Sequence, residues 1–208
     1  MAGCCQTECG LDPNAGKQRQ TLWIVLAINA VMFVVIAAAA FVGSSNSLMA
    51  DSLDNLGDSL TYGLSLYAVA KAGSVKSKVA LFKGGLILLA ALVVAGNIVY
   101  KLIVPSVPSF EMMGIFSLAG LAANSVCLVL LTRHRNEDVN MSSVWECSRN
   151  DIASNLSVFV AAGAVWATGS MWPDMIVAAA LVCLLLRSAI RVNTSAITEL
   201  RTAHNAAN

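Results

Sequence analysis

Charged residues are scarce in this sequence. Asp, Glu, Lys and Arg make up 12% of the 208 residues, about half the fraction usual in soluble globular domains, whereas 57% are hydrophobic. The net charge of +1 and the lack of a long basic block argue against nucleic-acid binding. We also expect no cleavable signal peptide, because the polar first twenty residues are followed by an apolar run too long for an h-region. The composition is that of an integral membrane protein.

Motifs for hydrolysis and catalysis are also missing. The sequence contains no GxxxxGK[ST] loop for nucleotides, and nothing in it resembles a catalytic triad, a deaminase site or an organic-cofactor loop. Its six cysteines do not form the pattern of a disulfide framework, because Cys127, Cys147 and Cys183 lie in apolar runs. We therefore expect neither an enzyme nor an organic cofactor.

Long apolar runs are what the sequence has in quantity. Six can be marked, at residues 21–43, 47–72, 79–104, 110–132, 141–168 and 172–192. Each is close to the roughly 20 residues that a helix needs to cross a bilayer. The sequence therefore predicts an all-α polytopic membrane protein with six transmembrane helices. Its parts are a tail at 1–20, a transmembrane domain at 21–192 and a short second tail at 193–208.

Lysine and arginine gather on alternate connectors of these runs. They precede the first run and follow the second, fourth and sixth, whereas the connectors around 44–46, 105–109 and 169–171 have none. Lys101 is the single basic residue near the connectors that have no lysine or arginine. By the positive-inside rule both termini should be cytoplasmic, and we expect the protein in the inner (plasma) membrane of the cell.

The second run carries carboxylates where a membrane helix should have few. Asp51, Asp54 and Asp58 follow one another at spacings of three and four, so they share one face of a helix. Each charged carboxylate costs about 2.5–3.5 kcal/mol inside a bilayer even on the mildest scale. Three of them predict a cation, a proton or a water-filled cavity beside this helix.

The fifth run adds a second pair of ligands. Cys147 and Asp151 are four residues apart, as Asp54 and Asp58 are in the second run. Four donors from two facing helices suit the tetrahedral shell of zinc. The carboxylates alone would also accept manganese or magnesium, whereas a thiolate favours zinc or cadmium.

Other polar residues lie beside these pairs. Asp51, Asn55 and Asn155 are accessory candidates near the site. The alternative interpretation is that the acids only line a polar cavity or pair with Arg149 and Lys83.

Two features at the ends of the runs carry further expectations. Cys4, Cys5 and Cys9 in the N-terminal tail either capture a soft metal on the cytoplasmic side or have no specific role. Asp174, at the start of the sixth run, is expected to cap its own helix or to face water.

The paired motifs resemble those of the cation diffusion facilitator family. The stretch SNSLMADSLDNLGDSL is similar to that family's second-helix signature, whose [HD]xxxD metal pair falls here on Asp54 and Asp58. The stretch CSRNDIASNLSVFVAA is similar to the fifth-helix signature and places the second pair on Cys147 and Asp151. The resemblance covers all six runs. It implies a homodimeric antiporter that exports a divalent metal from the cytoplasm in exchange for protons, with zinc as first candidate and cadmium or cobalt as alternatives.

This sequence departs from the family pattern in two places. Cys147 stands where the family usually has histidine or aspartate, which bears on the choice of metal. The chain ends at Asn208 without the cytoplasmic metal-binding domain that commonly follows the sixth helix, so we expect a short form. Two other functions are compatible with the residues. One is a non-transporting membrane sensor or handover protein that uses the N-terminal cysteines, and the other is a passive channel.

Overall fold

The computed structural model describes residues 16–68, 73–132 and 139–205. Over these ranges the chain is helical except for short connectors, and no strand occurs in them. The helices are α1 (Gly16–Val42), α2 (Asn46–Ala68), α3 (Gly73–Ile103), α4 (Phe110–Thr132), α5 (Val139–Thr168) and α6 (Trp172–Asn205). Each corresponds to one predicted run.

The helix ends differ from prediction mainly in α6. This helix continues beyond residue 192 to Asn205, because residues 193–205 contain neither proline nor glycine to end it. The α4 bounds agree with the predicted run. Residues 1–15 of the predicted first tail, with Cys4, Cys5 and Cys9, lie outside the described residues, whereas residues 16–20 belong to α1.

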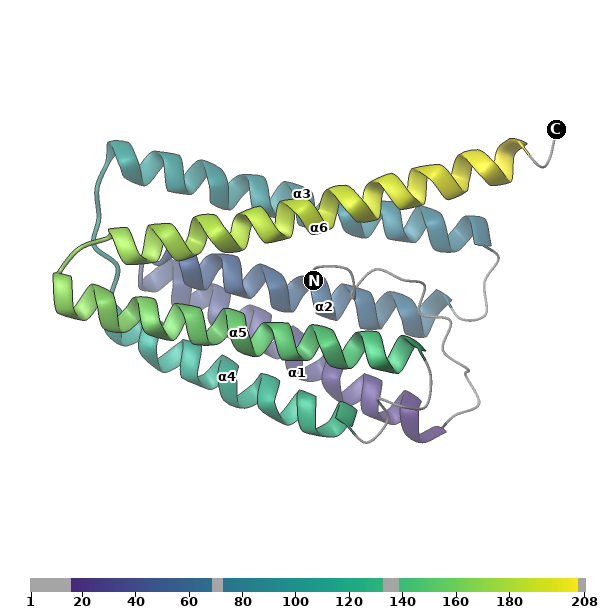
Figure 1. The fold of residues 1–208 in the computed structure, drawn as a ribbon, viewed down its shortest axis with the longest axis horizontal. Coiled ribbons are helices and arrows are strands. Elements are labelled where there is room, and N and C mark those ends of the chain that lie inside the picture. Colours follow the sequence, from purple (N-terminus) through teal and green to yellow (C-terminus); the bar gives the residue numbers. More distant parts are fainter. Residues whose placement is uncertain (1–15, 69–72, 133–138, 206–208) are drawn as a thin grey trace.

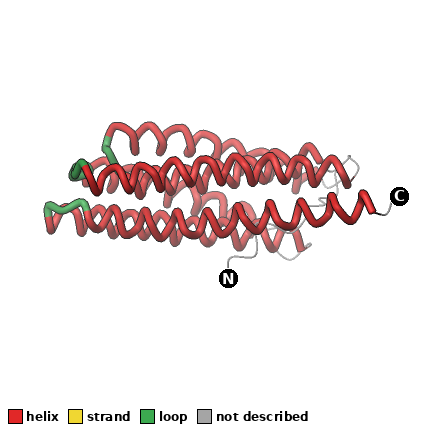
Figure 2. Tube along the Cα trace, turned by 90° about the horizontal axis from the view of Figure 1, so that it is seen from above, coloured by secondary structure: helices red, strands yellow, loops and turns green. Residues whose placement is uncertain are grey.

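The six helices run alternately in opposite directions along one axis (Figures 1 and 2). The connectors at 43–45, 104–109 and 169–171 lie together at one end of the bundle, and the start of α1 and the end of α6 lie at the other (Figure 1). A hydrogen bond of 2.9 Å from Ser109 N to Gly43 O joins two of these connectors. We call the end of the bundle that contains these three connectors the connector end.

Helix α2 occupies the centre of the bundle and contacts each of the other five helices. The most extensive contacts are those of α1 with α2, α4 with α5, and α3 with α6. The α3–α6 pair lies along one edge (Figure 1). The helix that carries Asp51, Asp54 and Asp58 is therefore enclosed by its neighbours, which keeps these carboxyl groups away from the outer surface of the bundle.

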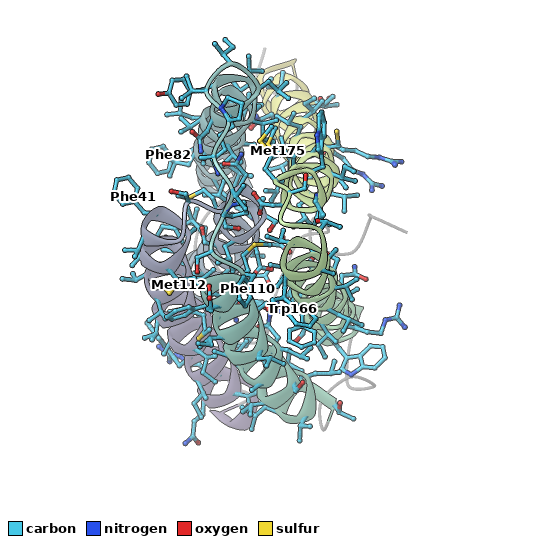
Figure 3. The ribbon with its side chains drawn as sticks, turned by 90° about the vertical axis from the view of Figure 1, so that its left-hand side faces the viewer. Phe41, Phe82, Phe110, Met112, Trp166 and Met175 are labelled. Carbon is cyan, nitrogen blue, oxygen red and sulfur yellow. The ribbon has the colours of Figure 1, made fainter. Side chains whose placement is uncertain are left out.

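The interior combines alanines with larger apolar side chains, and the outer surface also carries large apolar side chains. Buried alanines such as Ala50, Ala91 and Ala161 allow the helix backbones to approach closely. Phe41 and Phe82 instead point away from the bundle (Figure 3), and 81% of the Phe41 surface is exposed. Such a surface is unfavourable in water and suits contact with lipid.

Five helical segments are long and apolar enough to cross a membrane: Arg19–Val42, Leu81–Ile103, Phe110–Thr132, Ser148–Thr168 and Trp172–Thr198. The described part of α2 is not among them, because its aspartates and amides make it too polar. Its 23 residues nevertheless extend about 34 Å at 1.5 Å per residue, enough for the hydrocarbon core. A sixth span and cytoplasmic termini remain predictions.

The expectation for Asp174 is wrong. This residue lies in the first turn of α6 but its exposed fraction is 0%, so it does not face water. Its carboxylate accepts hydrogen bonds from the start of α2 rather than capping its own helix. The error arose because the position in the sequence shows only the helix that contains Asp174 and not the helix packed against it.

Candidate metal centre

The acids of α2 lie inside the bundle. Asp51 and Asp58 are buried, with exposed fractions of 1% and 6%, and Asp54 is half-buried. Asp151 on α5 is also buried. The spacing of three and four residues therefore places these side chains as expected, on the face of α2 that is covered by other helices.

Asp58 connects the two helices. Its Oδ2 atom accepts a hydrogen bond of 3.2 Å from the Tyr62 hydroxyl, one turn further along α2. A side-chain hydrogen bond also joins Asp58 to Asp151 on α5. An ionised carboxylate only accepts hydrogen bonds, so this contact needs a proton between the two carboxyl groups.

Asp54 lies against the same part of α5. The Ser154 side chain on α5 lies close to the Asp54 carboxyl group. Asp54 is also within electrostatic reach of Asp58 and of Asp151. Asp54, Asp58 and Asp151 are thus within electrostatic reach of one another at the contact between α2 and α5.

The fourth predicted ligand is not described. Cys147 lies within the bounds of α5, but its side chain is outside the described residues. Within the described parts of the chain, no three His, Cys, Asp or Glu side chains form a group able to hold a metal ion. Metal binding by Asp54, Asp58, Cys147 and Asp151 therefore stays a prediction.

The three accessory candidates supply buried oxygen atoms nearby. Asn55 Nδ2 donates to Asp51 O at 3.0 Å, and Asn155 Nδ2 donates to Asp151 O at 2.8 Å. Each amide nitrogen is thus bonded to the helix backbone one turn earlier. The Oδ1 atoms of both asparagines and both carboxylate oxygens of Asp51 have no hydrogen-bond partner among the described residues.

Gly120 on α4 makes room for one of these asparagines. A Cβ atom at residue 120 would lie 1.9 Å from Asn155 Oδ1 and 3.0 Å from Asn155 Cγ. Asn155 is fully buried, so its side chain has little space in which to move away. The glycine is required for the contact between α4 and α5 at the level of Asn155.

The two basic residues considered as partners of the acids behave differently. Lys83 on α3 is buried, its ammonium group donates to Thr61 Oγ1, and its charge acts on Asp58. Arg149 is exposed and its guanidinium lies 5.3 Å from the centre of the Trp145 ring. Of these two basic residues, Lys83 is therefore the one that interacts electrostatically with an acid of the site.

Sequence reasoning missed two contacts of the site. Tyr62 follows Asp58 by four residues, and Ser154 follows Asp151 by three. Both spacings put the hydroxyl on the same helix face as the acid. This periodicity was available in the sequence, but it does not show which helix the face meets.

Comparison with known proteins gives one family. The family model described as Cation efflux transmembrane domain matches residues 22–200. The match begins in α1 and ends in α6, so it includes every helix that contributes to the site. No curated protein matches the chain.

Proposed function

The chain belongs to the cation efflux family, also known as the cation diffusion facilitator family, and from this premise we propose that it exports a divalent metal from the cytoplasm in exchange for protons. Transport of a metal cation across a membrane follows from the family. The proposal adds the metal, with zinc first and cadmium or cobalt as alternatives, the proton as counter-ion, and a site made by Asp54, Asp58, Cys147 and Asp151.

One observation carries the proposal. The buried carboxyl groups of Asp58 on α2 and Asp151 on α5 share a hydrogen bond inside a bundle whose outer surface suits lipid. A proton shared by these two carboxyl groups would occupy oxygen atoms that a metal ion would also need. Metal ligands must be deprotonated, so metal entry releases protons and proton entry releases metal.

Burial accounts for the coupling of the two ions. A group of ionised carboxylates in a low-dielectric interior is costly. Protons or a divalent cation each neutralise that charge, which favours both occupied forms over the empty ionised form. One site can therefore exchange two ions without hydrolysis of a nucleotide.

The ligand set supports zinc as the first candidate. Two aspartates from α2, one aspartate from α5 and a thiolate one turn before it on α5 would give four ligands, the usual number for zinc. The thiolate favours zinc or cadmium over harder ions such as magnesium. We propose that α2 and α5 tilt relative to the other helices to expose this site to one side of the membrane at a time.

Flux measurements on purified protein in proteoliposomes test the proposal. Wild-type protein should move zinc at a rate that depends on an imposed pH gradient. Asp58→Asn and Asp151→Asn should each lower the initial zinc flux by at least about 100-fold, because even the loss of an outer-shell partner of a metal ligand costs about 10–100-fold. Glu111→Gln is the matched control, since this exposed acid contacts only the nearby Ser109 hydroxyl among the hydrogen bonds of the described residues.

The same assay separates the alternatives. A sensor or handover protein gives no flux, and a passive channel gives flux that does not depend on the pH gradient. Wild-type flux in Asp58→Asn or Asp151→Asn would contradict the assignment of the site.

The remaining parts of the proposal concern the assembly and the tail. We propose a homodimer in the inner membrane with both termini in the cytoplasm, on the basis of the family and the distribution of lysine and arginine. Mass measurement in detergent tests the first, and protease protection tests the orientation. Cys4, Cys5 and Cys9 are proposed to capture metal, which a lower zinc stoichiometry after deletion of residues 1–10 would support.

A further inference from the structure

The start of α2 is bonded to a residue 127 positions away in the sequence. Asp174 Oδ1 accepts hydrogen bonds from Ser47 N at 3.0 Å, Ser47 Oγ at 2.6 Å and Ser45 Oγ at 2.7 Å. Its Oδ2 accepts from Asn46 N at 2.9 Å. Both oxygens of this fully buried carboxylate are therefore used by the first turn of α2 and the residue before it.

This arrangement differs from ordinary helix capping. The first N–H groups of a helix lack partners within the helix, and its N-terminus carries a partial positive charge. A residue next to the helix usually supplies the acceptor, and Ser45 Oγ does so here for Leu48 N at 3.1 Å. Asp174 adds a full negative charge from another helix. Since Asp174 is itself in the first turn of α6, two helix N-termini meet at one carboxylate.

Two residues of α3 also donate hydrogen bonds to this turn. Asn97 Nδ2 donates to Asn46 Oδ1 at 2.6 Å, and the Lys101 ammonium donates to Ser44 O. Ser44 has a φ of 49°, in the left-handed region that non-glycine residues seldom adopt. Lys101 is buried and lies within electrostatic reach of Asp174. Both helices of the α3–α6 pair thus bind the turn that begins α2.

The bonds link this turn to the acids further along α2. Asp54 follows Ser47 by seven residues, about 10 Å along a helix. Relative movement of α2 and α6 at the connector end must break the bonds of Asp174. We infer that Asp174 is a positioning residue that holds the start of α2 against α6, keeps the connector end closed, and so sets the side from which the α2 acids are reached.

Hydrogen–deuterium exchange on the full-length protein in nanodiscs tests the hold on α2 without any transport. In Asp174→Asn the amide keeps one acceptor oxygen and turns an NH₂ group toward donors. We expect the amides of Asn46 and Ser47 to exchange at least about tenfold faster, with α4 and α5 unchanged. Glu111→Gln, an exposed acid at the same end, should exchange as the wild type does.

Ser47→Ala is the second variant in case Asp174→Asn does not fold. It removes one donor to Asp174 and leaves the carboxylate in place, so a smaller but local increase in exchange is expected at the start of α2. Wild-type exchange of these amides in whichever variant is folded would overturn the inference.

Zinc flux tests the positioning role, and this part rests on the proposed function. Loss of the hold lowers the fraction of molecules that receive zinc from the cytoplasmic side. A threefold lower fraction raises the apparent KM about threefold, while Glu111→Gln keeps the wild-type KM. Faster exchange with an unchanged KM would mean that Asp174 only stabilises the start of α2, and this result would overturn its positioning role. Absence of flux in the wild type would instead refute the proposed function, and the exchange result would still decide the hold on α2.

Discussion

Replacing Gly120 by alanine tests the packing of α4 against α5 beside the site. The added Cβ would lie 1.9 Å from Asn155 Oδ1 and 3.3 Å from Ile36 Cδ1. Asn155 must then rotate or α4 must move, and rotation removes the 2.8 Å hydrogen bond from Asn155 Nδ2 to Asp151 O. Overpacking costs about 1–3 kcal/mol, and loss of the hydrogen bond costs about 1 kcal/mol more. The higher helix propensity of alanine offsets up to about 1 kcal/mol of this cost, so we expect Gly120→Ala to lower the free energy of unfolding by about 1–3 kcal/mol.

Gly114 on the same helix provides the matched control. A Cβ at residue 114 meets no atom within 4 Å, so Gly114→Ala should be neutral or stabilise the helix by up to about 1 kcal/mol. Unfolding of both variants in detergent, followed by circular dichroism, measures the difference. Adding Asn155→Ala to Gly120→Ala should restore part of the lost stability, because the double variant removes the overlap.

The result also bears on the site. Asn155 is one helical turn from Asp151 and donates a hydrogen bond to its carbonyl oxygen. Displacement of Asn155 in Gly120→Ala should therefore lower zinc flux, whereas Gly114→Ala should keep the wild-type flux. Equal midpoints of unfolding for the two alanine variants would refute the reasoning, because they would mean that the Asn155 side chain does not fill the space beside Gly120.

Two further predictions concern the proposed ligands. Cys147→His should keep transport and shift the selectivity from cadmium toward zinc, since imidazole is a harder ligand than thiolate; an unchanged ratio of cadmium to zinc flux would count against a thiolate ligand. Tyr62→Phe removes the 3.2 Å hydrogen bond to Asp58, at about 1 kcal/mol. It should change the KM for zinc about fivefold, and a wild-type KM would show that the hydroxyl does not orient the carboxylate.

The helices of this fold follow from composition and the lengths of the apolar runs. Run 110–132 agrees with α4, and the i, i+3 and i+4 spacings place Asp51 and Asp58 on a buried face. These features depend on one helix at a time, which is why the sequence is sufficient to predict them. The helical extension past residue 192 was missed because a loss of apolar character ends a membrane span without ending a helix.

Contacts between helices were harder to predict. The bond of Asp58 to Asp151 agrees with the expected approach of α2 and α5, but that expectation depended on two paired motifs and not on packing. Nothing in a single sequence relates Asp174 to Ser47, or Lys83 to Thr61. Such contacts depend on which faces of different helices meet, and many arrangements of six apolar helices bury similar area.

The central place of α2 has a consequence for how the protein is made. The ribosome completes α2 well before α5 and α6, so its aspartates leave the ribosome before the residues that later enclose them. With the proposed six spans, each ionised aspartate of α2 in lipid costs about 2.5–3.5 kcal/mol until those helices arrive, and the first turn of α2 lacks the Asp174 carboxylate. The enclosure of α2 by its neighbours is therefore complete only after α6 has been synthesised.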